Sequence, residues 1–123
     1  MHTHQIRLST LLIGCFLAIG CGDPTDAEGE PELPSQYMAG RTTYDAKCAS
    51  CHDSSRDGAP RLGYQPAWSR RLEQGESVLI EHATNGYEMM PPRGDNEDLT
   101  DDAVAEAVKY MIYQAGLNIP AGG

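Results

Sequence analysis

The sequence predicts a small all-α domain of about four helices. Apolar residues recur at helical spacing in several segments, and no pair of segments has the pattern of paired β-strands. The chain has 123 residues, 40% of them hydrophobic, with 13 Gly and 8 Pro, so we expect a small core and many loops. It contains one Phe and one Trp. A domain with so little core usually needs a disulfide, a metal or a cofactor for its stability.

The first helix is expected over residues 35–49. Helical spacing places three of its residues on one side: Gly40, Tyr44 and Cys48. Because glycine has no Cβ, Gly40 permits another helix to approach this backbone closely. The second helix is short and begins near Pro66, which suits a first turn. It carries Trp68 and, four residues later, Leu72.

Two longer helices follow. The third is expected over residues 77–85 and ends at Gly86. The fourth begins after Thr100, a good N-cap that is followed by two acidic residues at the positive end of the helix dipole. Its apolar residues form one face at helical spacing: Val104, Ala107, Val108, Met111 and Ile112. Gly116 closes this helix.

Residues 1–20 are typical of a bacterial lipoprotein signal peptide. A weakly basic start precedes an apolar run of about 13 residues, which is too short to span a bilayer comfortably. The run ends at Cys21, in a segment similar to a lipoprotein cleavage box, although Ala18 stands where Leu is usual. Residues 12–15, which end at Cys15, match the lipoprotein cleavage box better, but cleavage there would leave almost no hydrophobic region in the signal peptide. We therefore predict lipidation of Cys21. The alternative is ordinary cleavage that leaves Cys21 as a free thiol, a liability in an oxidising compartment.

The segment after the signal is acidic and rich in proline. Residues 22–35 hold five acidic residues and three prolines, too little apolar surface for folding. With the lipidated Cys21 they form a predicted tether at 21–35; a disordered leader without a spacing role is the alternative. The folded domain is then expected at 36–118, followed by a C-terminal tail at 119–123.

The motif at residues 48–52, Cys-Ala-Ser-Cys-His, has the C-x-x-C-H pattern of covalent haem attachment. Two thiols three positions apart near a helix end reach two vinyl groups on one porphyrin edge, and His52 then lies beneath the ring with a nitrogen toward the iron. A thioredoxin-like motif would need a preceding strand, and a zinc site would need two more ligands at matching spacing. A structural disulfide between Cys48 and Cys51 would leave His52 unexplained. One covalent haem c is therefore the predicted cofactor.

The iron needs a sixth ligand or an open site, and residues 85–94 offer a donor. Met90 precedes Pro91, which disfavours helix and holds Met90 extended. A Met ligand opposite His raises the reduction potential relative to a second His. Met89 and His82 are the alternatives. The proline constraint favours Met90.

The overall charge excludes one class of partner. Nine basic and eighteen acidic residues give a formal charge of −9 and a pI near 4.7, which argues against nucleic acid. Near the haem segments, basic and acidic residues interleave: Lys47, Arg56, Arg61 and Arg93 with Asp53, Asp57, Glu88 and Asp95. A mixed solvated surface and a docking patch for a partner both remain open.

From about residue 37 to residue 116 the sequence resembles class I cytochromes c, and within that class cytochrome c5. The matching segments are CASCH at 48–52, GAPRLG at 58–63, the helix start at 67–68, NGYEMMPPRG at 85–94 and the stretch 99–112, which ends AVKYMI. The resemblance implies a cytochrome c fold of about four helices wrapped around one covalently bound haem. It places the last helix across the first, with Tyr110 near Gly40 and Tyr44.

The same resemblance implies several contacts around the haem. Pro60 is expected to offer its carbonyl to the other nitrogen of His52, and Leu62 to press on the haem face. Trp68 is expected in the core against the haem edge; donation of its N–H to a haem propionate is the alternative. The sequence departs from the family at two positions: Met89 stands where Ala is common, and Asp95 where Gly is expected.

In this resemblance Cys48 and Cys51 bind the haem, and His52 and Met90 are its proximal and distal ligands. A haem with both axial positions filled has no place for a substrate, so the expected function is that of an electron carrier and not of an enzyme. Its expected partners are redox proteins, namely an oxidase, reductase or dehydrogenase. A small-ligand sensor or a peroxidase-like enzyme with a labile Met ligand is the alternative. We expect a monomer in the bacterial periplasm, anchored to the membrane through lipid on Cys21.

Overall fold

The computed structural model describes residues 32–118. The predicted signal peptide, Cys21, most of the tether and the tail at 119–123 lie outside these residues. Within them every regular element is helical, and the one β feature is an isolated bridge between Tyr87 and Met90. The predicted all-α class is confirmed. No helix in the described part of the chain is long and apolar enough to cross a membrane.

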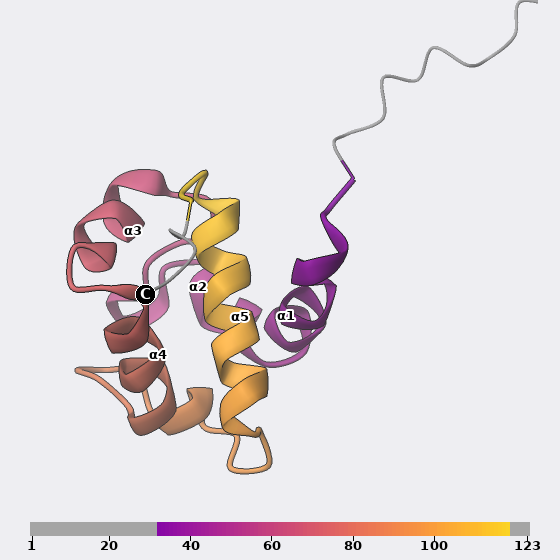
Figure 1. Cartoon of the computed structure of the whole chain (residues 1–123). Coiled ribbons are helices and arrows are strands. Elements are labelled where there is room, and N and C mark those ends of the chain that lie inside the picture. The colour runs from indigo at the N-terminus through magenta and orange to yellow at the C-terminus, as the bar shows by residue number, and fades with distance from the viewer. Residues whose placement is uncertain (1–31, 119–123) are drawn as a thin grey trace, which may run out of the picture. The chain divides into compact units, whose positions relative to one another are not determined.

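The described residues form five α-helices (Figure 1): α1 Met38–Thr43, α2 Ala49–His52, α3 Gln65–Leu72, α4 Glu76–Asn85 and α5 Asp101–Gln114. A π-helical turn, Tyr44–Cys48, joins α1 to α2, and a short 3₁₀ turn, Ser35–Tyr37, precedes α1. The first helical segment therefore runs without a break to His52, three residues further than expected. Counting it as one gives the four predicted helical segments.

The segment that carries the cysteine motif continues α1 through the π-helical turn. The sequence predicted Gly40, Tyr44 and Cys48 on one side of a regular helix. In the structure Gly40 and Tyr44 are buried and Cys48 is half-buried. Cys48 packs against the core cluster that contains Tyr44.

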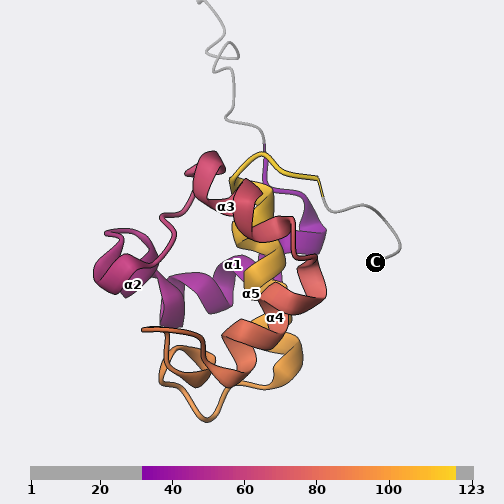
Figure 2. The same ribbon diagram turned by 90° about the vertical axis from the view of Figure 1, so that its left-hand side faces the viewer.

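Helix α5 lies across α1, as Figures 1 and 2 both show. A Cβ added at Gly40 would lie 2.1 Å from the carbonyl oxygen of Glu106 and 2.9 Å from the Cβ of Tyr110. Beside this contact the rings of Tyr44 and Tyr110 are tilted at 55°, with centroids 5.5 Å apart. The predicted approach of Tyr110 to Gly40 and Tyr44 is confirmed. Only glycine fits at position 40.

Helix α5 supplies six of the twelve buried hydrophobic residues in the described part of the chain. The Thr100 hydroxyl accepts a hydrogen bond from the Ala103 N–H at 3.2 Å and so caps the helix, as expected. All five residues of the predicted apolar face are buried, together with Tyr110 and Ala115. Trp68 of α3 and Leu79 of α4 belong to the same core cluster. The elements that enclose the site are therefore fixed by packing against α5.

Candidate functional site

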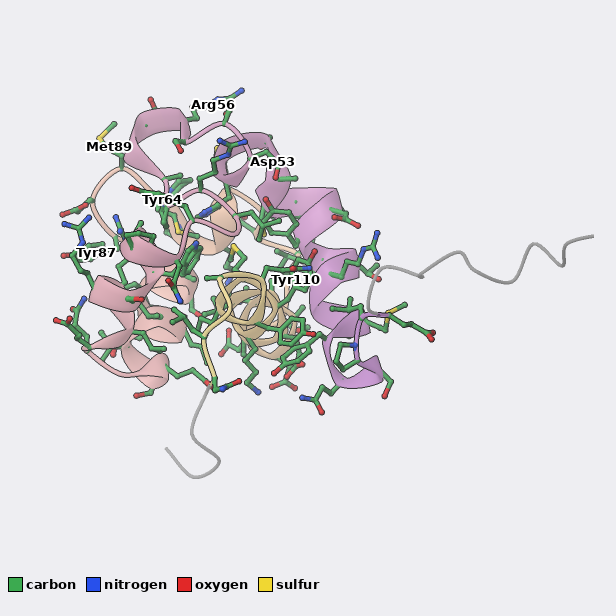
Figure 3. The ribbon with its side chains drawn as sticks, turned by 90° about the horizontal axis from the view of Figure 1, so that it is seen from above. Asp53, Arg56, Tyr64, Tyr87, Met89 and Tyr110 are labelled. Carbon is green, nitrogen blue, oxygen red and sulfur yellow. The ribbon has the colours of Figure 1, made fainter. Side chains whose placement is uncertain are left out.

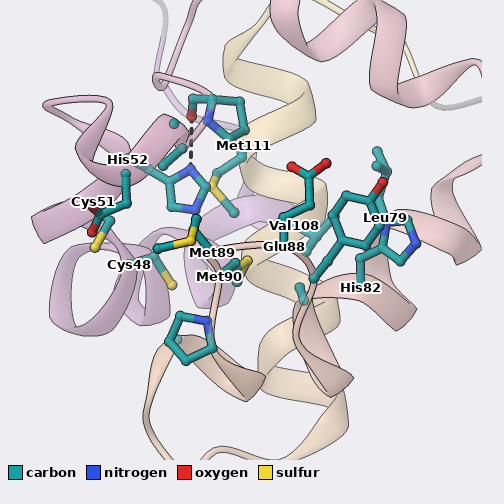
Figure 4. A pocket seen from close by; sticks show the side chains of 18 of the residues that line it. Cys48, Cys51, His52, Leu79, His82, Glu88, Met89, Met90, Val108 and Met111 are labelled. Atoms are coloured by element: carbon teal, nitrogen blue, oxygen red, sulfur yellow. Dashed lines mark hydrogen bonds between the residues drawn. The ribbon is translucent and has the colours of Figure 1, made fainter.

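A cavity of about 630 Å³ opens between the helices, and Figure 4 shows side chains that line it. Its walls come from the cysteine motif, α3, α4, α5 and the loop that carries the methionine pair. Apolar side chains form much of the lining: Trp68, Leu79, Ala83, Val108 and Met111. Ligand sites in proteins have volumes of about 300–1,000 Å³ and predominantly apolar linings. The cavity thus has the size and character of a site for a large, mainly apolar group.

Cys48 and Cys51 both line this cavity, from the π-helical turn and from α2. Both are free thiols, so the structural disulfide considered above is absent between them. Burial, with a smaller contribution from Cys51, raises the pKa of Cys48 to about 11. No cluster of three or more His, Cys, Asp or Glu side chains in residues 32–118 could hold a metal ion. The described part of the chain therefore offers no set of ligands for a zinc ion.

His52 is 6% exposed and is the last residue of α2. Its Nδ1 lies 2.8 Å from the carbonyl oxygen of Pro60, drawn as the dashed line in Figure 4. A carbonyl only accepts, so Nδ1 carries the proton, and Nε2 is left with its lone pair. Burial lowers the pKa of His52, which keeps the imidazole neutral near pH 7. The side chain is thus prepared to donate a lone pair to a metal.

The backbone around His52 is tied down on both sides. The Leu62 N–H donates to the His52 carbonyl at 2.9 Å, so the loop that carries Pro60 is fastened to the end of α2. On the other side the Tyr44 hydroxyl donates to the carboxylate of Asp53. Burial and this hydrogen bond both raise the pKa of Tyr44. The sequence held no signal for the contact between Tyr44 and Asp53, because their spacing suits no local motif.

The methionine pair lies in a tight turn. Tyr87 and Met90 exchange two backbone hydrogen bonds, both of 2.9 Å, so Glu88 and Met89 form the tip. Glu88 takes the left-handed conformation that a tight turn requires, with φ of 53°. Met89 is 70% exposed and lies at the edge of the molecule in Figure 3, whereas Met90 is half-buried against the core cluster. Both line the cavity, Met89 at its mouth and Met90 against the core.

The loop beyond Met90 is held in an unusual conformation. Arg93, Gly94 and Asp95 have φ values of 54°, 63° and 66°. Asp is one of the few residues besides glycine that visits this region readily, which explains how Asp95 replaces the expected Gly. The guanidinium of Arg93 donates to the Leu99 carbonyl at 2.7 Å and pairs with the Asp101 carboxylate. These bonds tie the loop to the start of α5.

Three other predicted residues lie in or beside the site. The Trp68 indole N–H donates to the Arg61 carbonyl at 2.8 Å, and Trp68 is 3% exposed and lines the cavity. Its donation to a haem propionate stays a prediction. Leu62 is partly buried against the core cluster and is not among the cavity-lining residues. His82 lines the cavity with its ring stacked on Tyr87 at 3.9 Å and 12°. The sequence did not single out Leu79, Ala83, Val108 or Met111 as site residues, because their apolar pattern is that of ordinary core.

The chain is similar to several proteins of known type. The sequence model of the family described as "Cytochrome C oxidase, cbb3-type, subunit III" matches residues 35–111. The chain is 44% identical over 81 residues to cytochrome c-555 of Chlorobaculum tepidum, covering 63% of this chain and 75% of that protein. It is 35% identical over 66 residues to cytochrome c5 of Ectopseudomonas mendocina, covering 52% of this chain and 76% of that one.

A solved structure that contains a cytochrome c is also similar to this chain. The cytochrome in a crystal structure of an electron transfer complex of nitrite reductase with cytochrome c aligns with a TM-score of 0.60 and 36% identity. The alignment covers 63% of this chain and 95% of that one. Two free thiols, a buried neutral imidazole and a large apolar cavity fit a covalently attached haem. The chain therefore belongs to the family of c-type cytochromes, as a class I monohaem member that carries one covalent haem c and serves as an electron carrier.

Proposed function

We propose that Cys48 and Cys51 hold the haem through thioether bonds, that His52 and Met90 are its axial ligands, and that the protein passes single electrons between redox proteins in the bacterial periplasm. The observation that carries this proposal is the hydrogen bond between His52 Nδ1 and the Pro60 carbonyl. It leaves Nε2 as the free donor of a buried ring that lines the cavity beside both thiols. A carbonyl partner of this kind orients a metal-bound imidazole and strengthens it as a donor.

The packing of the methionine pair supports Met90 as the second ligand. The two backbone hydrogen bonds of the turn direct Glu88 and Met89 to its exposed tip. Met90 is instead held between the core cluster and the cavity, with Pro91 following in an extended conformation at ψ of 157°. A side chain that is already half-buried loses less conformational entropy when it binds a metal. The ring of His82, the other candidate ligand, also lines the cavity and is stacked on Tyr87.

Electron transfer requires little more of the chain than a rigid, dry site. The haem iron supplies the one-electron couple. His52 and Met90 would fill both axial positions, which leaves no site for a substrate, and a thioether ligand favours a higher potential than a second imidazole would. The apolar side chains of Leu79, Val108 and Met111 line the site and disfavour water in it. The sensor or peroxidase-like alternative requires instead that Met90 leave the iron readily.

The proposal also covers the partner, the cellular location and the oligomeric state of the protein. The similar cytochrome crystallised with nitrite reductase supports a redox enzyme as the class of partner. The pattern of residues 1–20, followed by Cys21 and an acidic tether, supports export and a lipid anchor at the membrane. We propose a monomer in this setting.

The ligand assignment is tested with Met90→Ala beside its matched control, Met89→Ala. In the ferric holoprotein a Met–iron bond gives a weak sulfur-to-iron charge-transfer band. We expect Met89→Ala to keep this band and Met90→Ala to lose it and to bind cyanide rapidly. An unchanged band in Met90→Ala would refute the assignment. Rapid cyanide or carbon monoxide binding by the unmodified protein, with no band, would favour the sensor or enzyme.

Attachment and anchoring need separate experiments. Haem held by two thioethers stays with the protein in acidified acetone, and we expect this of the unmodified chain but not of Cys48→Ala/Cys51→Ala. Release of haem from the unmodified chain would contradict covalent attachment.

The lipid anchor is tested with Cys21→Ser, which is expected to move the protein from the membrane to the periplasmic fraction. Continued retention on the membrane would exclude the lipid.

A further inference from the structure

One side-chain hydrogen bond joins the residues on either side of the haem-attachment motif. Tyr44, the first residue of the π-helical turn, donates its hydroxyl to the carboxylate of Asp53, the residue directly after α2. The two residues are nine positions apart, and the whole motif at 48–52 lies between them. The bond therefore closes the chain around the two cysteines and His52.

Helix α2 depends on such contacts for its direction. It is a single turn, Ala49–His52, and so short a helix is not stable by itself. The loop that follows supplies one set of contacts: the Leu62 N–H donates to the His52 carbonyl at 2.9 Å, and the Pro60 carbonyl accepts from His52 Nδ1 at 2.8 Å. The bond from Tyr44 is a separate contact, because it ties the end of α2 to the segment that precedes the motif.

The two partners of this bond differ in how firmly they are held. Tyr44 is 2% exposed, and its ring packs on Tyr110 in the core cluster. A side chain in so dense a core does not shift without disturbing its neighbours. Asp53 is exposed, so its own packing does not fix it. A hydrogen bond to a carboxylate is stronger than one between neutral groups. The bond thus fastens the residue next to His52 to the core.

We propose that Tyr44 is a positioning residue for His52: by holding Asp53 it fixes the plane of the His52 imidazole relative to the two cysteines. The inference rests on the proposed function, in which His52 binds the haem iron. It goes further because the C-x-x-C-H pattern specifies neither a hydroxyl before the motif nor an acid directly after it. If the bond only satisfied a buried hydroxyl, its loss would lower stability and leave the ligand unchanged.

Tyr44→Phe and its matched control, Tyr110→Phe, separate these two roles. Each variant removes one hydroxyl from the same buried aromatic pair. The Tyr110 hydroxyl accepts from the side chain of Gln114, on its own helix, at 2.9 Å. Both variants are expected to raise the equilibrium constant of unfolding about three- to tenfold. Only Tyr44→Phe is expected to change the surroundings of the iron.

The orientation of the imidazole is measured by NMR of the ferric full-length holoprotein. The shifts of the haem methyl groups depend on the planes of the axial ligands, so their pattern reports a rotation of His52. We expect Tyr44→Phe to alter this pattern and to change the ratio of reduced to oxidised protein at a fixed applied potential about twofold. Tyr110→Phe is expected to preserve both. An unaltered methyl pattern in Tyr44→Phe would overturn the proposal.

Two substitutions of Asp53 test the same bond from its exposed end, where the core is not touched. Asp53→Ala removes the acceptor, whereas Asp53→Asn keeps an oxygen that accepts the hydroxyl but removes the charge. We expect Asp53→Ala to reproduce the methyl pattern of Tyr44→Phe, and Asp53→Asn to retain the pattern of the unmodified protein. The double variant Tyr44→Phe/Asp53→Ala should match either single variant, since each removes the same bond. If Asp53→Asn instead resembled Asp53→Ala, the charge and not the bond would control the ligand, and the proposal would fail.

The unmodified holoprotein distinguishes failure of this inference from failure of the proposed function. With His52 and Met90 on the iron, it shows a paramagnetically shifted, exchangeable proton from His52 Nδ1 and the sulfur-to-iron charge-transfer band. Absence of either signal refutes the proposed ligands. Presence of both, with methyl shifts that do not respond to changes at Tyr44 or Asp53, refutes only the positioning role.

Discussion

Gly40→Ala tests the crossing of α1 and α5, on which the whole enclosure of the site depends. The new Cβ would lie 2.1 Å from the Glu106 carbonyl oxygen, 2.7 Å from the Glu106 carbonyl carbon and 2.9 Å from the Cβ of Tyr110. Two of these atoms are backbone in the middle of α5, so no side-chain rotation relieves the clash. Helix α1 must therefore move away from α5 by about 1 Å to regain ordinary van der Waals distances.

The cost follows from the contacts that this movement stretches. The pair Tyr44 and Tyr110, and the stacked pair Tyr37 and Tyr113 at 4.2 Å, join the residues on either side of α1 to α5. Each aromatic pair contributes about 0.5–1.5 kcal/mol, and overpacking a core costs about 1–3 kcal/mol or more. Replacing a helical glycine by alanine returns about 1 kcal/mol of helix propensity. We expect a net loss of about 2–4 kcal/mol in the free energy of unfolding.

The measurement is guanidinium unfolding of the ferric holoprotein, followed by the fluorescence of Trp68, which lines the haem cavity and is the one Trp of the chain. In thermal unfolding the same loss lowers the midpoint by about 10–25 °C. The matched control is Ala39→Gly, at the neighbouring exposed position, for which propensity alone predicts a loss of about 1 kcal/mol. If Gly40→Ala were stabilising, the close crossing of the helices would be wrong.

Three further substitutions test the parts that hold the site. Arg93→Lys breaks the hydrogen bonds that tie the methionine loop to the start of α5, so it should lower the free energy of unfolding by about 1–2 kcal/mol. The control Arg41→Lys alters an exposed ion pair of 3.5 Å and should change the free energy of unfolding by less than about 0.5 kcal/mol. Similar losses in the two variants would contradict the role of Arg93. Thr100→Ala removes the cap of α5 and should cost about 1 kcal/mol, measured by denaturant unfolding; no loss would show that the cap is dispensable. Trp68→Phe leaves a carbonyl without its indole partner and should cost about 1–2 kcal/mol with the charge-transfer band unchanged; loss of the band would mean that Trp68 also controls ligation.

Local patterns were enough to predict most of the helices. The apolar face of α5, its cap at Thr100 and the end of α4 at Gly86 all follow from spacing and cap residues, and the structure confirms them. The close approach at Gly40 was also predicted, because a glycine in a helical pattern has few other reasons to be there. The helices and their caps depend on residues close together in the chain, whereas the partner of Gly40 on α5 was implied by the resemblance to class I cytochromes c.

What could not be predicted depends on residues far apart. The π-helical turn Tyr44–Cys48 has no signature in its residues, since an α-helix would accept the same segment. The hydrogen bond of the Trp68 indole to the Arg61 carbonyl, and the contact of Tyr44 with Asp53, depend on how loops close against helices. Val108 and Met111 line the cavity although their pattern is that of ordinary core. Periodicity tells which residues are buried, but it does not tell which of them surround a void.

The crossing of α1 and α5 has a consequence for how the chain acquires its structure. The two helices lie at opposite ends of the described sequence, and the last one contributes half of the buried hydrophobic side chains. A chain that lacks its final segment therefore lacks half of its core, and contacts between distant residues form slowly. In an exported chain Cys48 and Cys51 would cross the membrane before α5, so the thiols would remain accessible to haem while the domain is still open. A product truncated before Asp101 would lack the helix that closes the domain.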